Sequence, residues 1–159
     1  MYSDFQCPFC SRGHKTVTEF INNYKGKVKF YYKNLPLDFH EMAQLSAQYF
    51  EAIRMQSVDK AFKFMNLVYG DQNKLGSDKE AFLKAMAKKV GANMKKLATD
   101  VKSDAVLQKI KKDSAEAAEF GMQGTPGFVL NGIPIRGAYP ISHFQKVIDE
   151  LKTRGKLSL

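Results

Sequence analysis

The sequence has few cysteines, few histidines and no long apolar run. Its 159 residues include two cysteines and three histidines. Two cysteines cannot form a disulfide framework for a chain of this length, so they are candidates for a redox or a metal role. No apolar run approaches the roughly 18 residues that can span a membrane, so we expect a protein that is not membrane-embedded. The start of the chain has neither a basic segment nor an apolar core, so we predict no signal peptide in it.

Negative charge is the scarcer sign, because 25 basic residues oppose 16 acidic ones and give a formal net charge of +9. Most of the basic residues are lysines, and the adjacent pairs stand on predicted helices with acids nearby: Lys88–Lys89, Lys95–Lys96 and Lys111–Lys112. Nucleic-acid grooves usually combine clustered Lys and Arg with exposed aromatic residues. Dispersed lysine is more typical of a solvated surface, so we expect no nucleic-acid partner.

Both cysteines stand in the stretch Phe5–Arg12, with the spacing Cys-x-x-Cys between Cys7 and Cys10. The following apolar residues have helical spacing, which predicts a helix over residues 11–24 and places Cys7 at or just before its N-terminus. Unpaired N–H groups and the helix dipole stabilise an anion at that position. A thiolate is such an anion, so Cys7 should have a lowered pKa and act as a nucleophile. Cys10, one turn further in, would be the resolving thiol of a dithiol–disulfide exchange site.

Strand patterns occur only toward the two ends of the chain. Residues 28–35 are rich in β-branched and aromatic side chains, which predicts a strand. The helix before them is long enough to cross over between parallel strands. Only six residues precede Cys7, so the first strand of such a unit should be short or missing. From residue 39 to about residue 121 the apolar pattern is helical throughout.

The last part of the chain predicts a β-hairpin followed by a helix. The hairpin spans residues 128–136 and turns at Asn131–Gly132, a pair that favours a type I′ turn. Pro134 cannot donate a ladder hydrogen bond, so its strand should lie at a sheet edge. Pro140 opens the final amphipathic helix. Within the helical stretch we expect N-caps at Ser57 and Ser103 and a capping box over Ser77–Glu80.

Three motifs resemble one family in the expected order along the chain. They are SDFQCPFC at residues 3–10, NLPLDFHEMA at residues 34–43 and GMQGTPGFVLNG at residues 121–132. They resemble the DsbA-like disulfide oxidoreductases over essentially the whole chain. The resemblance implies an α/β thioredoxin-like fold with a helical insertion and a short or missing N-terminal strand. It divides the chain into a thioredoxin-like domain, residues 1–38 and 122–159, and a helical insertion, residues 39–121.

The same resemblance implies the parts of the site. Cys7 and Cys10 would form a redox-active disulfide that needs no other cofactor. Thr125–Pro126 would be a cis peptide against that disulfide, presenting the Thr125 backbone to an extended substrate in the manner of an added strand. Pro8 and Phe9 would tune the cysteines. A His in place of Phe9 could favour the thiolate and Phe cannot, so we expect a weaker oxidant than a Cys-Pro-His-Cys protein.

The family also suggests an activity and a setting. We predict a protein disulfide oxidoreductase, with the oxidase direction favoured over reductase or isomerase action. Its substrates would be cysteine-containing proteins or peptides, and a membrane redox partner is a candidate for re-oxidising or reducing it. The resemblance points to the periplasm or another extracytoplasmic compartment. Family members often have a buried acid six residues before the first cysteine, where this sequence has Met1.

Two other classes of function stay open at this point. Cys7, Cys10 and His14 stand at i, i+3 and i+7, so a helix could bring them to one face as part of a zinc site, although such a site needs a fourth ligand or a water. His14 is more simply a surface helix residue, and His40 a residue at a helix start. A non-catalytic binding module that kept the fold is the other alternative, and the intact Cys-x-x-Cys argues against it.

Overall fold

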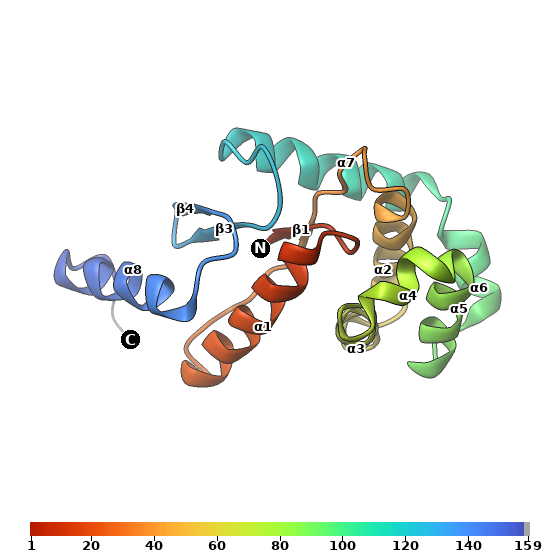
Figure 1. Ribbon diagram of the computed structural model, residues 1–159, viewed down its shortest axis with the longest axis horizontal. Helices are drawn as coiled ribbons and strands as arrows, with labels where there is room; N and C mark the ends of the chain where they lie inside the picture. Colours follow the sequence, from red (N-terminus) through yellow and green to blue (C-terminus); the bar gives the residue numbers. More distant parts are fainter. Residues whose placement is uncertain (158–159) are drawn as a thin grey trace.

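The computed structural model describes residues 1–157 and contains a mixed sheet with the strand order β2-β1-β3-β4. The strands are β1 (Tyr2–Ser3), β2 (Lys33–Asn34), β3 (Gly127–Leu130) and β4 (Ile133–Arg136). β1 runs parallel to β2 and antiparallel to β3, and β3 and β4 form the hairpin. Figure 1 shows the two ends of the chain meeting in this sheet, while helices α2–α6 lie to one side of it.

Residues 1–157 contain eight helices. They are α1 (Pro8–Asn23), α2 (Ala43–Gln56), α3 (Val58–Gly70), α4 (Gln72–Ser77), α5 (Lys79–Lys89), α6 (Met94–Asp100), α7 (Asp104–Glu119) and α8 (Ile141–Thr153). α1 connects β1 to its parallel neighbour β2, and α2–α7 stand between β2 and β3 in the chain. The predicted thioredoxin-like fold class is therefore confirmed. The boundaries of the two domains stay a prediction, and residues 158–159 lie outside the described residues.

The predicted hairpin is confirmed in its turn and in its place in the sheet. Asn131 and Gly132 both have positive φ, 47° and 88°, as a type I′ turn requires. Pro134 lies opposite Val129 in β4, which is the edge strand, so its missing N–H leaves no gap in a central ladder.

Two of the three expected helix starts are confirmed. The Ser57 hydroxyl accepts a hydrogen bond from the Lys60 amide, and the Ser103 hydroxyl accepts one from the Val106 amide. The capping box over Ser77–Glu80 is wrong. Ser77 is the last residue of α4, and its hydroxyl donates to Asp78 Oδ1 at 2.7 Å instead of capping α5.

The strand predicted over residues 28–35 is wrong except at Lys33–Asn34. Lys33 N donates to Met1 O and Leu35 N donates to Ser3 O, both at 2.9 Å. The ladder with β1 therefore covers this short segment only, and residues 28–30 run past its end. An apolar, β-branched composition does not by itself make a strand where no partner strand lies beside it.

Two groups of buried side chains meet along α1. One lies among the insertion helices and includes both cysteines, with Phe5 fully buried against aromatic rings of α2 and α3. The other joins α1 to the hairpin and α8 through these side chains: Val17, Phe20, Phe128, Ile135, Phe144 and Ile148. The N-terminus of α1 is thus fixed at the boundary between the sheet and the insertion. None of the helices in residues 1–157 is long and apolar enough to cross a membrane.

Candidate active site at the start of α1

Cys7 stands at the N-cap of α1. Its backbone is extended, with φ −72° and ψ 120°, and Pro8 follows as the first helical residue, where its missing N–H costs nothing. Cys7 O accepts the amide hydrogen of Cys10 at 3.0 Å, which closes the first turn. This turn has no acidic side chain. The helix N-terminus is therefore open to an anion, and the Cys7 thiolate is the group placed to use it.

The two sulfur atoms have different surroundings, although both cysteines are buried free thiols. As a thiol, Cys7 donates from Sγ to the carbonyl oxygen of Thr125 at 3.5 Å. Cys10 is completely buried, and its Sγ accepts a hydrogen bond from the Asp4 amide at 3.4 Å. Cys7 therefore faces the loop before β3, and Cys10 faces the interior.

These surroundings shift the two pKa values in opposite directions. The hydrogen bond from the Cys10 thiol lowers the pKa of Cys7 to about 5, helped by Thr125 and the backbone amides of Phe9 and Cys10, while burial acts in the other direction. Burial raises the pKa of Cys10 far above its ordinary value, and the hydrogen bond to Cys7 raises it further. At neutral pH the reduced pair is then a Cys7 thiolate that accepts a hydrogen bond from the Cys10 thiol.

The loop before β3 lies directly against this pair. The Thr125–Pro126 peptide bond is cis, and Pro126 O accepts the Gly137 amide at 2.9 Å. Gly13 lets α1 approach the loop, because a Cβ at this position would lie 3.1 Å from Pro126 Cγ and 3.2 Å from Phe128 Cζ. The structure thus brings together Cys7, Cys10 and Thr125–Pro126, which the sequence analysis selected from distant parts of the chain.

Two further side chains belong to the site: the Thr125 hydroxyl is buried, and the Phe9 ring is exposed. The Thr125 hydroxyl is close enough to lower the pKa of both cysteines, yet within residues 1–157 its Oγ1 has no hydrogen-bond partner of good geometry. Phe9 is 54% exposed, and its neighbour Pro8 is exposed as well. The Arg12 guanidinium carbon lies 4.6 Å from the centre of the Phe9 ring. The outer face of the site is therefore apolar with one cation above it.

Sequence reasoning missed the residues behind Cys10. The buried Asp4 carboxylate accepts hydrogen bonds from the Gln6 amide at 2.7 Å, the Leu37 amide at 3.0 Å and His40 Nδ1 at 2.7 Å. The prediction for His40 is wrong, because α2 begins only at Ala43 and the His40 ring pairs with Asp4. Asp4 stood inside the cysteine motif, but no local pattern links it to a histidine 36 residues away.

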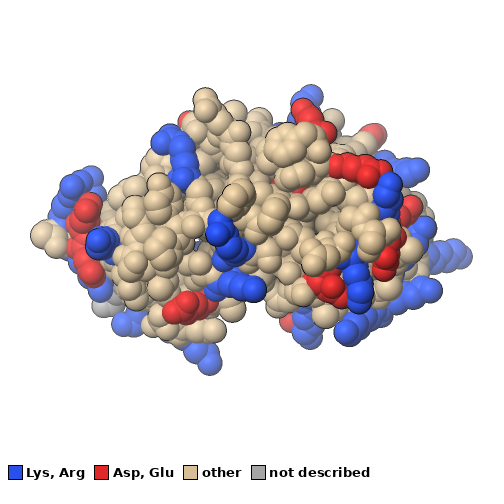
Figure 2. Space-filling view, viewed as in Figure 1, with Lys and Arg blue, Asp and Glu red and all other residues tan. Residues whose placement is uncertain are grey.

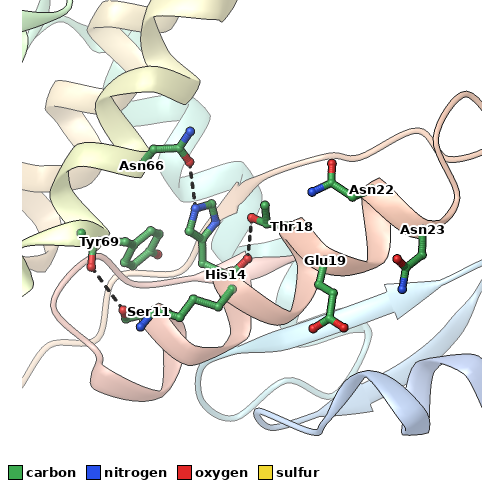
Figure 3. A pocket seen from close by; sticks show the side chains of 10 residues that line it. Ser11, His14, Thr18, Glu19, Asn22, Asn23, Asn66 and Tyr69 are labelled. Carbon is green, nitrogen blue, oxygen red and sulfur yellow. Dashed lines mark hydrogen bonds between the residues drawn. The ribbon is translucent and has the colours of Figure 1, made fainter.

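His14 does not join the two cysteines. Its Nε2 atom hydrogen-bonds to Asn66 Oδ1 at 2.8 Å, and its ring stacks on Tyr69 with 5.0 Å between the ring centres. It lines a groove of about 660 Å³ between α1 and α3. Figure 3 shows it there with Ser11 and Thr18 nearby. No group of three or more His, Cys, Asp or Glu side chains in residues 1–157 is arranged to hold a metal ion.

Charged side chains of both signs are dispersed over the visible surface (Figure 2). Figure 2 shows Lys and Arg spread over the visible face, its centre included, with Asp and Glu side chains and uncharged areas between them. Several lysines are paired with nearby acids, as in Lys63–Asp59, Lys84–Glu80 and Lys96–Asp100. The visible face shows no continuous basic stripe over the described residues. That the protein has no nucleic-acid partner stays a prediction.

Comparisons with known proteins agree with this fold. A protein-family profile described as Thioredoxin matches residues 1–150. Over 140 residues the chain is 30% identical to the "Probable disulfide bond formation protein D" of Bacillus anthracis, an alignment that covers 82% of this chain. The chain spans 63% of the length of that relative.

Two solved structures have the same fold. A thioredoxin-like oxidoreductase from Silicibacter pomeroyi DSS-3 matches with a TM-score of 0.82 and 24% identity, covering 96% of this chain and 84% of the other. The thiol-disulfide exchange protein alpha-DsbA2 from Wolbachia pipientis matches with a TM-score of 0.78 and 20% identity, covering 94% and 78%. The likeness to DsbA-like proteins that the three sequence motifs predicted is confirmed at the level of the fold.

Proposed function

Because this chain belongs to the thioredoxin family, we propose that it is a thiol–disulfide oxidoreductase that exchanges disulfides with protein thiols through Cys7 and Cys10. The observation that carries the proposal is the inequality of the two sulfurs. Cys7 is a low-pKa thiolate at a helix N-terminus, whereas Cys10 is a buried thiol of raised pKa beside it. A pair of this kind provides a nucleophile and good leaving group together with an internal thiol that can resolve a mixed disulfide.

In the oxidising direction, a substrate thiolate attacks Cys7 Sγ of the Cys7–Cys10 disulfide. The bond between the substrate sulfur and Cys7 forms, the Cys7–Cys10 bond breaks, and its electron pair stays on Cys10. A second substrate thiolate then attacks the substrate sulfur of the mixed disulfide. The substrate leaves as a disulfide, Cys7 leaves as a thiolate, and the enzyme is reduced by two electrons.

In the reducing direction the same steps run backwards. The Cys7 thiolate attacks a substrate disulfide, and the Cys10 thiolate then attacks Cys7 Sγ and releases the reduced substrate. A strongly stabilised Cys7 thiolate favours the reduced enzyme and therefore the oxidase direction, which we propose as the main one. The Phe9 side chain has no group that could donate a hydrogen bond to that thiolate, so we place the protein among the weaker oxidants of its kind.

The Thr125–Pro126 segment is the proposed substrate-binding element. Pro126 has no N–H. Thr125 O accepts a hydrogen bond from Cys7 Sγ only while Cys7 is a free thiol. In a mixed disulfide Cys7 carries no proton, so Thr125 O becomes available to a backbone N–H of the substrate. An extended peptide would then add to this segment as a strand does to a sheet edge.

The setting of the reaction follows from its chemistry. Disulfides form and persist in oxidising compartments, so we propose a periplasmic or other extracytoplasmic site of action on cysteine-containing proteins or peptides. Continued oxidation of substrates needs an electron acceptor for the reduced pair, and a membrane redox protein is the proposed class. A reductase or isomerase with the same site is the alternative, distinguished by the direction of net electron flow.

Two measurements on the purified protein test the proposal. We expect the oxidised protein to convert a peptide with two thiols to its disulfide faster than oxidised glutathione alone does. Equilibration with glutathione should place the Cys7–Cys10 potential above the approximately −270 mV of thioredoxin and below the approximately −120 mV of DsbA. A potential at or below that of thioredoxin would reassign the protein as a reductase. If the protein reacts with neither the dithiol peptide nor glutathione, the proposed function is refuted.

A further inference from the structure

The side chain of Gln72 joins the helical insertion to the segment that carries Cys7. Gln72 is the half-buried first residue of α4, and its Nε2 atom donates to Phe5 O at 2.7 Å and to Cys7 O at 2.9 Å. Carbonyl oxygens only accept hydrogen bonds, so the group that faces both of them must be the amide NH2. Both of its hydrogens are used in this way, and its partners fix the orientation of the side chain.

The two carbonyl groups that Gln72 holds stand on either side of the nucleophile. Phe5 O belongs to the peptide group before Gln6, and Cys7 O belongs to the peptide group after Cys7. Pro8 has a fixed φ, and it restricts Cys7 to the extended conformation that is observed, with φ −72° and ψ 120°. The direction of the Cα–Cβ bond follows from the backbone. A side chain that fixes both peptide groups therefore also fixes where Cys7 Sγ lies.

Other contacts set the position of Gln72 itself. The junction between α3 and α4 runs from Tyr69 to Gln72, and the Ser11 hydroxyl of α1 donates to Tyr69 O at 3.3 Å (Figure 3). The Tyr69 ring stacks on the Phe5 ring, with 5.2 Å between the ring centres. The junction is therefore held against α1 and against Phe5 by contacts that do not involve the Gln72 side chain. Removal of the Gln72 amide should leave the junction in place.

We propose that Gln72 is a positioning residue for disulfide exchange, whose amide holds Cys7 Sγ between Cys10 and the Thr125–Pro126 segment. The proposal rests on the proposed exchange function. A substrate thiolate attacks Cys7 Sγ in line with the Cys7–Cys10 bond. The new sulfur–sulfur bond forms as the old one breaks, and the electron pair of the old bond stays on Cys10. Such a step needs reacting atoms that are held near the geometry of attack, so a Cys7 backbone that is free to move lowers its rate. Gln72 acts through the backbone and exchanges no proton.

Gln72→Met tests this role, with Gln56→Met as the matched control. Methionine has a similar length but no N–H group to donate. Gln56, in α2, is also half-buried, and its side-chain amide likewise makes two hydrogen bonds to the backbone, donating to Asn93 O at 3.2 Å and accepting from Asn93 N at 2.8 Å. The measured quantity is the rate at which glutathione opens the Cys7–Cys10 disulfide. We expect Gln72→Met to slow it about tenfold or more, because small displacements of a reacting atom have effects of this size. Gln56→Met should leave the rate unchanged.

A second readout separates positioning from a general loss of structure. Cys7 is a stabilised thiolate because hydrogen-bond donors surround its sulfur, and these donors act only at short distance. The pH at which half of Cys7 is a thiolate should therefore rise in Gln72→Met and stay unchanged in Gln56→Met. Urea unfolding should show comparable losses of stability in the two variants. Gln72→Asn keeps the amide but is one methylene shorter, so it cannot reach both carbonyls and should also slow the opening.

Two results would overturn the inference and leave the proposed function intact. One is a Gln72→Met protein whose disulfide opens at the wild-type rate and whose Cys7 titrates as in the wild type. The other is an equal loss of rate in Gln72→Met and Gln56→Met, which would assign the effect to a general loosening of the insertion. A wild-type disulfide that opens no faster than a model disulfide would overturn the proposed function itself.

Discussion

Cys7 and Cys10 are separated by one helical turn, yet the structure surrounds them in opposite ways. Cys7 borders the outer face, with exposed Pro8 and Phe9 on one side and Thr125 on the other. Cys10 borders an inner wall of buried side chains that includes Phe5, Tyr69 and Ser3, and its sulfur accepts a hydrogen bond from the Asp4 amide. The same functional group is therefore a stabilised anion at one position and a neutral thiol at the other. A Cys-x-x-Cys spacing alone does not assign these roles, because they follow from what covers each sulfur.

The helical insertion builds much of the inner wall. Tyr69 comes from α3, and Gln72, the first residue of α4, donates from Nε2 to Phe5 O at 2.7 Å and to Cys7 O at 2.9 Å. In the opposite direction, Gln6 Oε1 accepts a hydrogen bond from the Met42 amide at 2.6 Å. The insertion thus fixes the backbone around the cysteines as well as covering it. The sheet side of the site supplies the Thr125–Pro126 segment.

The largest expected effect comes from exchanging one sulfur for oxygen. Cys7→Ser should abolish disulfide exchange, because the attacking atom is lost, whereas Cys10→Ser should accumulate a mixed disulfide with a thiol-containing peptide that nothing resolves. Mass spectrometry of the non-reduced protein measures both. Equal accumulation of mixed disulfide in the two variants would mean that the outer and inner sulfurs are interchangeable, which contradicts the comparison above.

The next effect concerns the hydrogen bond between the sulfurs. Cys10→Ala removes the largest contribution to the low pKa of Cys7, so that pKa should rise from about 5 toward the free value of about 8.5. The ultraviolet absorbance of the thiolate across a pH series measures the change. An unchanged titration would show that the helix N-terminus and Thr125 are sufficient without Cys10.

Packing of α1 on the Thr125–Pro126 segment can be tested at Gly13. A methyl group there would meet Pro126 and Phe128 at contact distances that require movement, so Gly13→Ala should cost about 1–3 kcal/mol of stability. Urea unfolding measures this cost. Gly76→Ala in α4 is the control, since a Cβ at Gly76 meets no atom within 4 Å and alanine is the better helix former. Equal losses in both variants would remove the argument for close packing.

The smallest effect is expected at Thr125. Thr125→Val replaces a buried hydroxyl that has no partner of good geometry within residues 1–157 by a methyl of similar size, so stability should be unchanged or slightly higher. The pKa of Cys7 should rise, but by less than in Cys10→Ala, because Thr125 contributes less to it. Thermal unfolding and thiolate titration of the same sample measure both quantities. A marked loss of stability would show that the hydroxyl has a partner in solution.

The elements that local pattern could predict were those that need no distant partner. The helix after the cysteines, the Ser57 and Ser103 caps and the Asn131–Gly132 turn depend on residues next to one another, and all are present. The strand over residues 28–35 needed a partner strand, so its composition was insufficient. The capping box failed for a related reason, because Ser77 already belongs to the preceding helix.

The residues of the site also differ in whether the sequence alone could predict them. Cys7 and Cys10 were visible from spacing, and Thr125–Pro126 from resemblance to a family. The inner wall was not visible, because serine and tyrosine at isolated positions have no signature until the fold places Ser3 and Tyr69 within hydrogen-bond distance. The pairing of Asp4 with His40 was missed for the same reason. The paired residues are 36 and 66 positions apart in the chain, so no periodic pattern in the sequence predicts their contacts.

The most direct test of the unequal pair is the pH dependence of alkylation at each cysteine of the reduced protein. Brief treatment with iodoacetamide followed by peptide mass spectrometry gives the two rates separately. We expect the Cys7 rate to be half-maximal near pH 5 and Cys10 to remain unmodified through neutral pH. Because the folded pKa of Cys7 lies below its unfolded value, the reduced form should also lose stability as pH falls through about 5. Two cysteines that titrate together near the free value of about 8.5 would contradict the account.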